Sequence, residues 1–188
     1  MSDAAPQETG GTSPEEAGAR PLLRVEGLST WFPIRGGVLR RVRGWIRAVD
    51  GVDLQVERAR TLALVGESGC GKTTVGRSVL RLEAPRSGRI DFDGVDLTRL
   101  GAAELRPYRR RLQMIFQDPA AALDPRLRVR DAIAEGMEAF AIGGNRVQRI
   151  ERVVELLRRV RLDADLMDRY PHELSGGQRQ RVCIARAL

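Results

Sequence analysis

The chain has 188 residues, a length that suits one domain or one domain with extensions. Its hydrophobic fraction of 42% is enough for a core and excludes wholesale disorder. The 32 basic and 25 acidic residues give a net charge of +7, but the basic residues are spread along the chain and aromatic residues make up only 4%. This balance argues against a stacking surface for single-stranded nucleic acid and is compatible with a nearby anionic lipid surface.

Two further classes are excluded by the distribution of apolar residues and cysteines. Leu62–Val65 is the longest apolar run near a predicted strand, and it is far shorter than the roughly 20 residues that span a bilayer. Residues 1–20 contain no apolar stretch of a secretory signal and are predicted to form a disordered tail. Cys70 and Cys183 make no disulfide framework, which suits a reducing cytoplasm.

The first half of the chain is predicted to contain mainly strands. Alternating or continuously apolar runs predict them, and Asp93-Gly94 predicts a tight turn. The expected strands lie at Pro21–Leu28, Ala48–Val56, Thr61–Val65 and in two short pieces within Arg89–Leu97, with a loop or hairpin at Trp31–Arg47. Thr61–Val65 is apolar throughout, as expected for a strand buried on both faces, and Lys72–Leu82 is predicted to be a helix.

The second half is predicted to be mainly helical. Leu112–Phe116 is one more candidate for a buried strand. Apolar residues at helical spacing predict a helix over Arg146–Val160, and a last helix is expected from near Ser175 to the end of the chain. The fold class is therefore α/β, with an N-terminal antiparallel part and a helical subdomain at about 118–175, inside a domain spanning 21–188.

A glycine-rich loop stands between a predicted strand and a predicted helix. Residues 66–73, Gly-Glu-Ser-Gly-Cys-Gly-Lys-Thr, fit the G-x-x-x-x-G-K-[ST] pattern of phosphate-binding loops without exception. Lys72 is the only lysine among the 32 basic residues, which suggests a position that needs a compact ammonium group. This segment predicts a nucleoside triphosphate site; a chance glycine-rich turn is the alternative.

Each residue type in this loop has a physical role in phosphate binding. Glycines at 66, 69 and 71 are expected to take positive φ and to bring backbone amides close to phosphate oxygens. The backbone of Glu67, Ser68 and Cys70 completes the loop. Lys72 is expected to reach the β- and γ-phosphates, the Thr73 hydroxyl to hold Mg²⁺, and Thr74 to assist through its hydroxyl or amide.

A second motif, Leu-Ser-Gly-Gly-Gln at 174–178, lies about a hundred residues downstream. Ser175 is a good N-cap, and Gly176 and Gly177 expose amides at the start of a helix, so the segment forms a candidate anion site. Taken in isolation, an ordinary capped helix after a loop explains it about equally well.

Together the two motifs resemble those of the ATP-binding cassette (ABC) ATPases. Longer strings are similar to the ATP-binding subunits of oligopeptide, dipeptide and nickel importers. They are AVDGVDL (48–54), TLALVGESGCGKTTVGRSVLRL (61–82), FDGVDL (92–97), QMIFQDP (113–119) and RYPHELSGGQRQRVCIARAL (169–188). The resemblance covers roughly residues 22–188 and implies a P-loop NTPase core that binds ATP and Mg²⁺.

The resemblance also implies roles for individual residues. Phe32 is the residue implied to stack on adenine, with Trp31 as the alternative. Gln117 is implied to touch Mg²⁺ and the attacking water, and with Lys72 it forms the catalytic pair of this chain. Ser175, Gly176, Gly177 and Gln178 are implied to bind the γ-phosphate of ATP held by a second ATPase subunit.

The implied partners are two membrane-spanning permease subunits, a second ABC ATPase subunit and, indirectly, an extracytoplasmic substrate-binding protein. No nucleic acid is expected as a partner. The stretch 129–160 is implied to contact the permeases. The implied location is peripheral, at the cytoplasmic face of the membrane, and the implied activity is ATP hydrolysis coupled to transport.

The sequence departs from the family pattern in several places. In this family an apolar strand ends in the Walker B aspartate, and the catalytic glutamate follows it. No apolar run that ends in Asp-Glu occurs in these residues. We therefore expect a truncated chain that is inactive and has exposed apolar strand edges. Ala59 and Arg161 stand where the family usually has glycine, so an αL conformation at Arg161 would cost roughly 1 kcal/mol. His172 is expected to be structural.

Two other functions remain open at this stage. One is a nucleotide-binding protein without catalysis, which the missing Walker B strand favours. The other is a soluble ABC ATPase that acts on nucleic acid through arginines at 40, 41, 43 and 47. Such proteins usually carry two cassettes or coiled-coil insertions, and neither is visible in the sequence.

Overall fold

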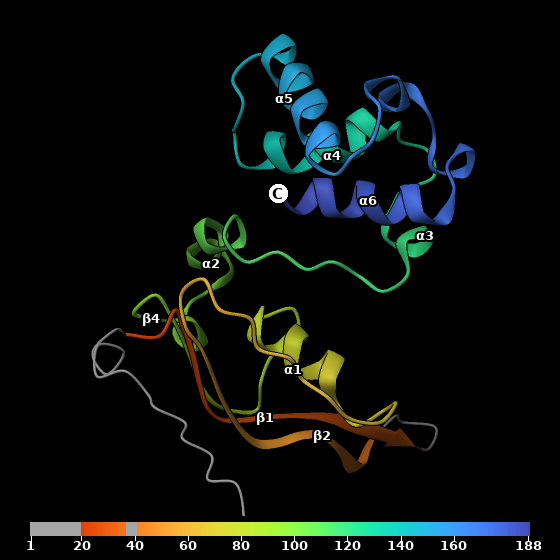
Figure 1. Cartoon of the computed structure of the whole chain (residues 1–188). Coiled ribbons are helices and arrows are strands. Elements are labelled where there is room, and N and C mark those ends of the chain that lie inside the picture. The colour runs from red at the N-terminus through yellow and green to blue at the C-terminus, as the bar shows by residue number, and fades with distance from the viewer. Residues whose placement is uncertain (1–19, 37–40) are drawn as a thin grey trace, which may run out of the picture. The chain divides into compact units, whose positions relative to one another are not determined.

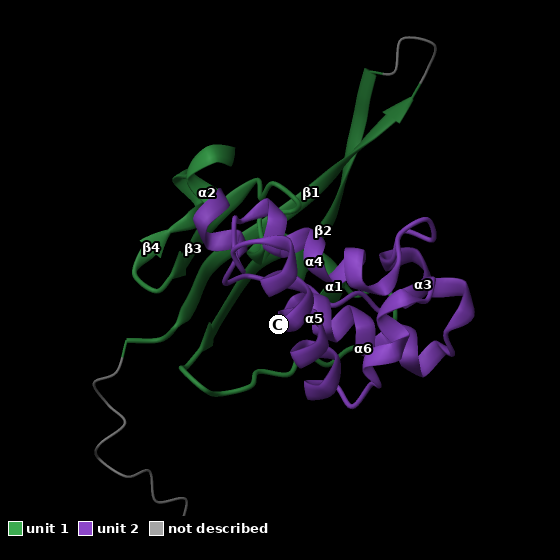
Figure 2. Cartoon of the chain, turned by 90° about the horizontal axis from the view of Figure 1, so that it is seen from above, with its two compact units in different colours: residues 1–105 green, residues 106–188 purple. Residues whose placement is uncertain are grey.

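A computed structural model describes residues 20–36 and 41–188, and these fall into two compact units (Figures 1 and 2). Unit 1 is Met1–Leu105 and contains the sheet. Unit 2 is Arg106–Leu188 and is helical. The predicted disordered tail lies outside the described residues, except for Arg20.

The sheet of unit 1 has four antiparallel strands in the order β2-β1-β3-β4 (Figure 2). The strands are β1 (Leu23–Gly36), β2 (Arg41–Val56), β3 (Ser87–Phe92) and β4 (Val95–Asp96). The first two form a long hairpin whose register runs from Leu23↔Val56 to Gly36↔Arg41. The segment predicted as a loop or hairpin is thus a hairpin, because its β-branched and aromatic residues continue the pairing across several bulges.

Helix α1 (Lys72–Val79) packs on this hairpin. The helix buries Val75, Ser78 and Val79 and contacts β1 and β2. It ends three residues before the predicted Leu82, because Arg81 takes a φ of +56° and the Leu82 amide bonds back to the Arg77 carbonyl at 2.8 Å. This is the bonding of a Schellman C-cap.

Two predicted strands are wrong. Thr61–Val65 and Leu112–Phe116 have no strand structure, and no described strand pairs with either segment. Val65 is 93% exposed, and Leu62 and Leu64 are each 45% exposed, so the predicted burial on both faces is also absent. The physical reason is that a strand needs a hydrogen-bonded neighbour, which an apolar run does not supply by itself.

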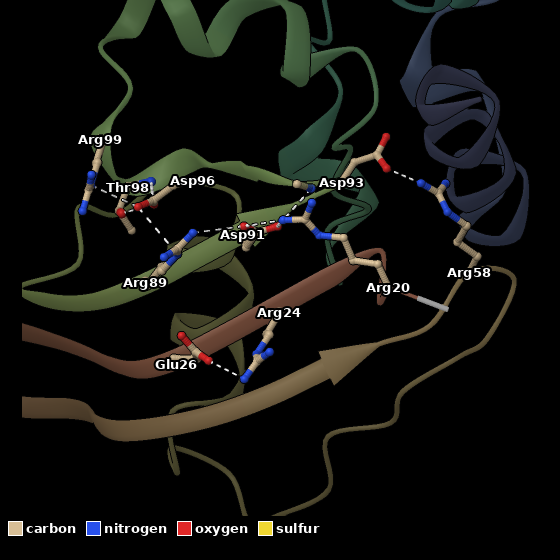
Figure 3. Close-up of polar contacts among 11 residues, drawn as sticks. Arg20, Arg24, Glu26, Arg58, Arg89, Asp91, Asp93, Asp96, Thr98 and Arg99 are labelled. Carbon is tan, nitrogen blue, oxygen red and sulfur yellow. Dashed lines mark hydrogen bonds and ion pairs between the residues drawn. The ribbon is translucent and has the colours of Figure 1, made fainter. Parts of the chain in front are cut away.

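Charged side chains connect the β3–β4 turn to the rest of unit 1 (Figure 3). The nearly buried Asp91 accepts hydrogen bonds from Arg20, from Arg89 at 3.3 Å and from the Gly94 amide at 3.0 Å. Arg58 pairs with Asp93 at the predicted Asp93-Gly94 turn. The turn is therefore held both by its backbone and by arginines distant in sequence.

Unit 2 packs its helices around one apolar core. The helices of this core are α3 (Pro119–Ala122), α4 (Val129–Ala139), α5 (Arg146–Arg159) and α6 (Gly176–Ala187), whereas α2 (Ala102–Arg109), which begins in unit 1, adds no residue to it. Short 3₁₀ turns occur at Leu97–Arg99 in unit 1 and at Ala164–Asp168 and Pro171–Glu173 here. Fully buried residues of the core include Val129, Val153, Leu157 and Val182.

Helix α5 confirms the predicted helix almost residue for residue. Its N-terminus has a capping box, in which Asn145 Oδ1 accepts from the Gln148 amide at 3.0 Å and the Gln148 side chain accepts from the Asn145 amide at 3.0 Å. Beyond its C-terminus Arg161 takes a φ of +58°, the αL conformation expected from its place in the sequence. Ala59 likewise has a φ of +57°. Both positions therefore bear the steric cost that glycine avoids.

None of the helices formed by residues 20–36 and 41–188 is long and apolar enough to cross a membrane.

Candidate phosphate-binding site

The phosphate loop (residues 66–73) wraps around the amine of its own lysine. Lys72 Nζ donates to the Gly66 carbonyl at 2.7 Å and to the Glu67 carbonyl at 2.6 Å, and it lies 3.5 Å from Cys70 Sγ. The two carbonyl bonds satisfy two of the three ammonium donors, whereas the sulfur is a weak acceptor. One donor therefore remains available to an anion in a loop whose residues 66–70 are all exposed.

Two of the three loop glycines take the left-handed conformation predicted for them. Gly69 has a φ of +83° and Gly71 a φ of +96°. A Cβ built on Gly71 would lie 2.3 Å from the Ala48 carbonyl oxygen, so only glycine lets the loop approach β2 this closely.

The positive φ predicted for Gly66 is wrong, although the position still favours glycine. Gly66 does not have a positive φ. A Cβ at this position would instead lie 2.7 Å from Cys70 Sγ, because the loop folds back on itself over the Glu67 carbonyl, which accepts from the Cys70 amide at 3.3 Å. Close packing inside the loop, and not backbone conformation, favours glycine here, because a Cβ would displace the Cys70 side chain.

Helix α1 begins at the end of the loop and presents its first hydroxyls to the surface. Gly71 is the N-cap residue, and its carbonyl accepts from the Val75 amide at 2.9 Å. Thr73 is exposed and Thr74 is half-buried. The start of the helix adds unpaired amides and a partial positive charge next to Lys72. The helix is held against β1 by a buried hydrogen bond of 2.7 Å between Thr30 Oγ1 and Ser78 Oγ.

The two candidate aromatic residues lie on opposite faces of β1, since side chains alternate along a strand. Trp31 Nε1 donates to Asp50 Oδ1 at 3.3 Å, and the guanidinium carbons of Arg47 and Arg86 each lie 4.5 Å from the centre of the Trp31 ring. Phe32 is half-buried and pairs with Ile46 in the hairpin register. Sequence reasoning missed Arg86 here, because nothing local connects it with Trp31.

The second motif lies in unit 2 at the start of α6, as predicted. Ser175 Oγ accepts from the Gln178 amide at 3.2 Å, and Gln178 Oε1 accepts from the Ser175 amide at 2.8 Å, so both side chains form a capping box. A Cβ on Gly176 or on Gly177 would meet nothing within 4 Å. Gly176 and Gly177 also have no positive φ, so neither packing nor backbone conformation requires glycine at these two positions. Glycine nevertheless lowers the stability of a helix. The pair fits an N-terminus that a ligand approaches closely.

The remaining predicted residues are distributed as follows. Gln117 is exposed and belongs to unit 2, next to Asp118, which caps α3 by accepting from the Ala120 amide at 2.8 Å. His172 stacks on Tyr170, with the ring centres 5.7 Å apart. This contact supports a structural role for the histidine.

Magnesium has candidate ligands here but no carboxylate cage. The described residues contain no cluster of three or more His, Cys, Asp or Glu side chains that would hold a metal by themselves. The exposed Thr73 hydroxyl next to a phosphate loop instead suits Mg²⁺, which usually keeps several waters and shares its ligands with a phosphate.

The chain thus combines an antiparallel sheet, a G-x-x-x-x-G-K-T loop that opens a helix, and a helical unit with a capped Leu-Ser-Gly-Gly-Gln motif, the features of an ATP-binding cassette. The ABC transporter family profile matches residues 49–188, and the chain belongs to this family. This confirms the resemblance and the fold class inferred from the sequence.

Two curated import proteins are similar to the chain over most of its length. The chain is 48% identical over 186 residues to the glutathione import ATP-binding protein GsiA of Pectobacterium atrosepticum, covering 99% of this chain and 29% of that protein. It is 47% identical over 168 residues to a putative peptide import ATP-binding protein of Brucella ovis, covering 89% of this chain and 50% of that protein. The chain thus spans half or less of the length of these relatives.

A solved structure shares the fold. A dimeric post-hydrolysis state of the ATP-binding cassette MJ0796 bound to ADP and Pi superimposes with a TM-score of 0.75 at 25% identity, covering 88% of this chain and 68% of that chain. The crystallised cassette is therefore a dimer that holds nucleotide.

Proposed function

We propose that this chain is the ATP-binding part of an ABC importer subunit, which couples ATP binding and hydrolysis to the uptake of small peptides. The observation that carries the proposal is the exposed Lys72 amine, held by the Gly66 and Glu67 carbonyls inside an open glycine loop. The relatives named for glutathione and peptide import favour a peptide cargo; nickel is the alternative.

Each residue of the phosphate loop has a part in holding the nucleotide. Lys72 binds the β- and γ-phosphates, and the amides of the loop and of the first turn of α1 surround them. Thr73 and Gln117 supply oxygen ligands to Mg²⁺, which when bound neutralises the charge that develops on the phosphates. The amides of Gly176 and Gly177, next to the Ser175–Gln178 cap, bind the γ-phosphate of ATP held by a second ATPase subunit.

Phe32 is the better candidate for the adenine contact. It is half-buried and lies two residues after Thr30, whose hydroxyl bonds to Ser78 of α1, the helix that begins at Lys72. Trp31 lies on the other face of β1 and is already engaged by Arg47, Arg86 and Asp50.

The wider assembly follows from the same assignment. Two permease subunits, a second ATPase subunit and, indirectly, a substrate-binding protein are the proposed partners. The protein is proposed to lie at the cytoplasmic face of the membrane, with α4 and α5 toward the permeases.

The test is a titration with a fluorescent ATP analogue in the presence of Mg²⁺. Lys72→Ala is expected to abolish binding and Phe32→Ala to weaken it. Arg77→Ala is the matched control: it removes one positive charge from the same helix, and its ion pair with Glu83, at 3.8 Å, is on the surface. Unchanged affinity of Lys72→Ala would refute the site.

The cargo is tested separately, by uptake of labelled di- and tripeptides and of nickel into cells that carry the wild-type or the Lys72→Ala gene. Loss of peptide uptake is the expected result. Loss of nickel uptake alone would reassign the cargo and leave the nucleotide site intact.

A further inference from the structure

The far end of the β1–β2 hairpin carries exposed apolar side chains. We define this distal hairpin by its described residues, Ile34–Gly36 and Arg41–Ile46. Its large apolar side chains are unusually exposed: Ile34 47%, Val42 50%, Trp45 45% and Ile46 57%. Exposed apolar side chains gathered in one place mark an interaction surface.

The same end of the hairpin is strongly basic. Arg35, Arg41 and Arg43 are exposed, and none of them pairs with a carboxylate in residues 20–36 or 41–188. Glu26 and Asp50 are the nearest acidic residues along the chain, with none between them. The other arginines in the strands, Arg24, Arg47 and Arg89, do have acidic partners. Figure 3 shows two of these, Arg24 with Glu26 and Arg89 with Asp91. The charge of the distal hairpin is thus uncompensated and suits an anionic partner.

The apolar side chains occupy both faces of the hairpin. Ile46 pairs with Phe32, and Ile34 lies two residues further along the same face. Trp45 lies on the opposite face, where the Arg86 guanidinium stands 4.8 Å from its ring centre. A single flat partner surface therefore cannot cover all of these side chains, whereas the interfacial region of a bilayer surrounds an inserted hairpin on both faces.

We propose that the distal hairpin inserts into the headgroup region of a bilayer containing anionic phospholipids. Arginine and tryptophan are suited to this region, where the charged group contacts phosphate and the ring contacts the acyl boundary. A nucleic acid fits less well, since a base stack leaves the exposed aliphatic side chains of Ile34, Val42 and Ile46 unused. The proposal does not depend on nucleotide binding.

The experiment is vesicle co-sedimentation of the full chain at low salt and without ATP. Vesicles of phosphatidylglycerol and phosphatidylcholine are compared with vesicles of phosphatidylcholine alone. Tryptophan fluorescence reports insertion directly, because the two tryptophans of the chain, Trp31 and Trp45, are both in the hairpin. We expect binding to the anionic vesicles with a blue shift of the emission, and weakening by added salt.

Matched variants assign the surface. Arg41→Gln with Arg43→Gln is expected to weaken binding by roughly 25-fold, at about fivefold for each charge. Arg58→Gln with Arg99→Gln removes the same net charge from exposed positions of unit 1 outside the distal hairpin and is expected to leave binding within about twofold of wild type. Ile46→Ser is expected to reduce the blue shift. Thermal unfolding of each variant confirms that it is folded.

Three outcomes would overturn the proposal. They are equal binding to zwitterionic and anionic vesicles, equal weakening by the two arginine pairs, and tight binding of single-stranded RNA that vesicles do not displace. The last result would assign the distal hairpin to nucleic acid.

Discussion

Replacing Gly71 by alanine tests whether the phosphate loop needs its contact with β2. The φ of +96° at Gly71 costs an L-residue about 1–2 kcal/mol. The new Cβ would also lie 2.3 Å from the Ala48 carbonyl oxygen, so the loop or the strand must move, at a further cost of about 1–3 kcal/mol. We expect Gly71→Ala to lower the free energy of unfolding by roughly 2–5 kcal/mol and to abolish ATP binding.

Gly76→Ala is the matched control in the next turn of the same helix. Its Cβ would meet nothing within 4 Å, and its φ is not positive. Alanine inside a helix is favoured over glycine by about 1 kcal/mol, so this variant is expected to be slightly more stable and to bind ATP normally. Urea unfolding and titration with a fluorescent ATP analogue measure both effects. The reasoning fails if Gly71→Ala matches wild type or if Gly76→Ala is equally damaging.

Two further predictions concern the cysteines and the end of α5. Cys70 is exposed in the loop, whereas burial in α6 raises the pKa of the Cys183 thiol. Maleimide should therefore label Cys70 first. ATP with Mg²⁺ should slow the labelling of Cys70 and leave that of Cys183 unchanged. Mass spectrometry of the labelled peptides measures this, and equal rates with and without nucleotide would place Cys70 outside the site. Arg161→Gly should raise the free energy of unfolding by about 1 kcal/mol, because Arg161 has a φ of +58°. Arg158→Gly, inside α5, should lower it by a similar amount, and urea midpoints that move together would contradict the αL explanation.

Local features of the site were predictable from the sequence because their interactions span only a few residues. The N-cap predicted at Ser175 is formed with Gln178, only three residues away. The apolar spacing within residues 146–160 and the Asp93-Gly94 turn are equally local, and the structure confirms both. The αL conformation at Arg161 also follows from its place after a helix.

Tertiary structure decided the features that depend on distant partners. Thr61–Val65 has the composition of a buried strand, but hydrogen bonds across a sheet come from another segment, and none in the described chain provides them. Residue 71 must be glycine because of the Ala48 carbonyl, which is distant in sequence. The Trp31 ring is covered by Arg86, whereas Thr30, two residues before Phe32, bonds to Ser78 of α1. A sequence pattern identifies one partner of such a contact, and only the fold identifies the other partner. The reason is that packing and strand pairing join residues that lie far apart along the chain.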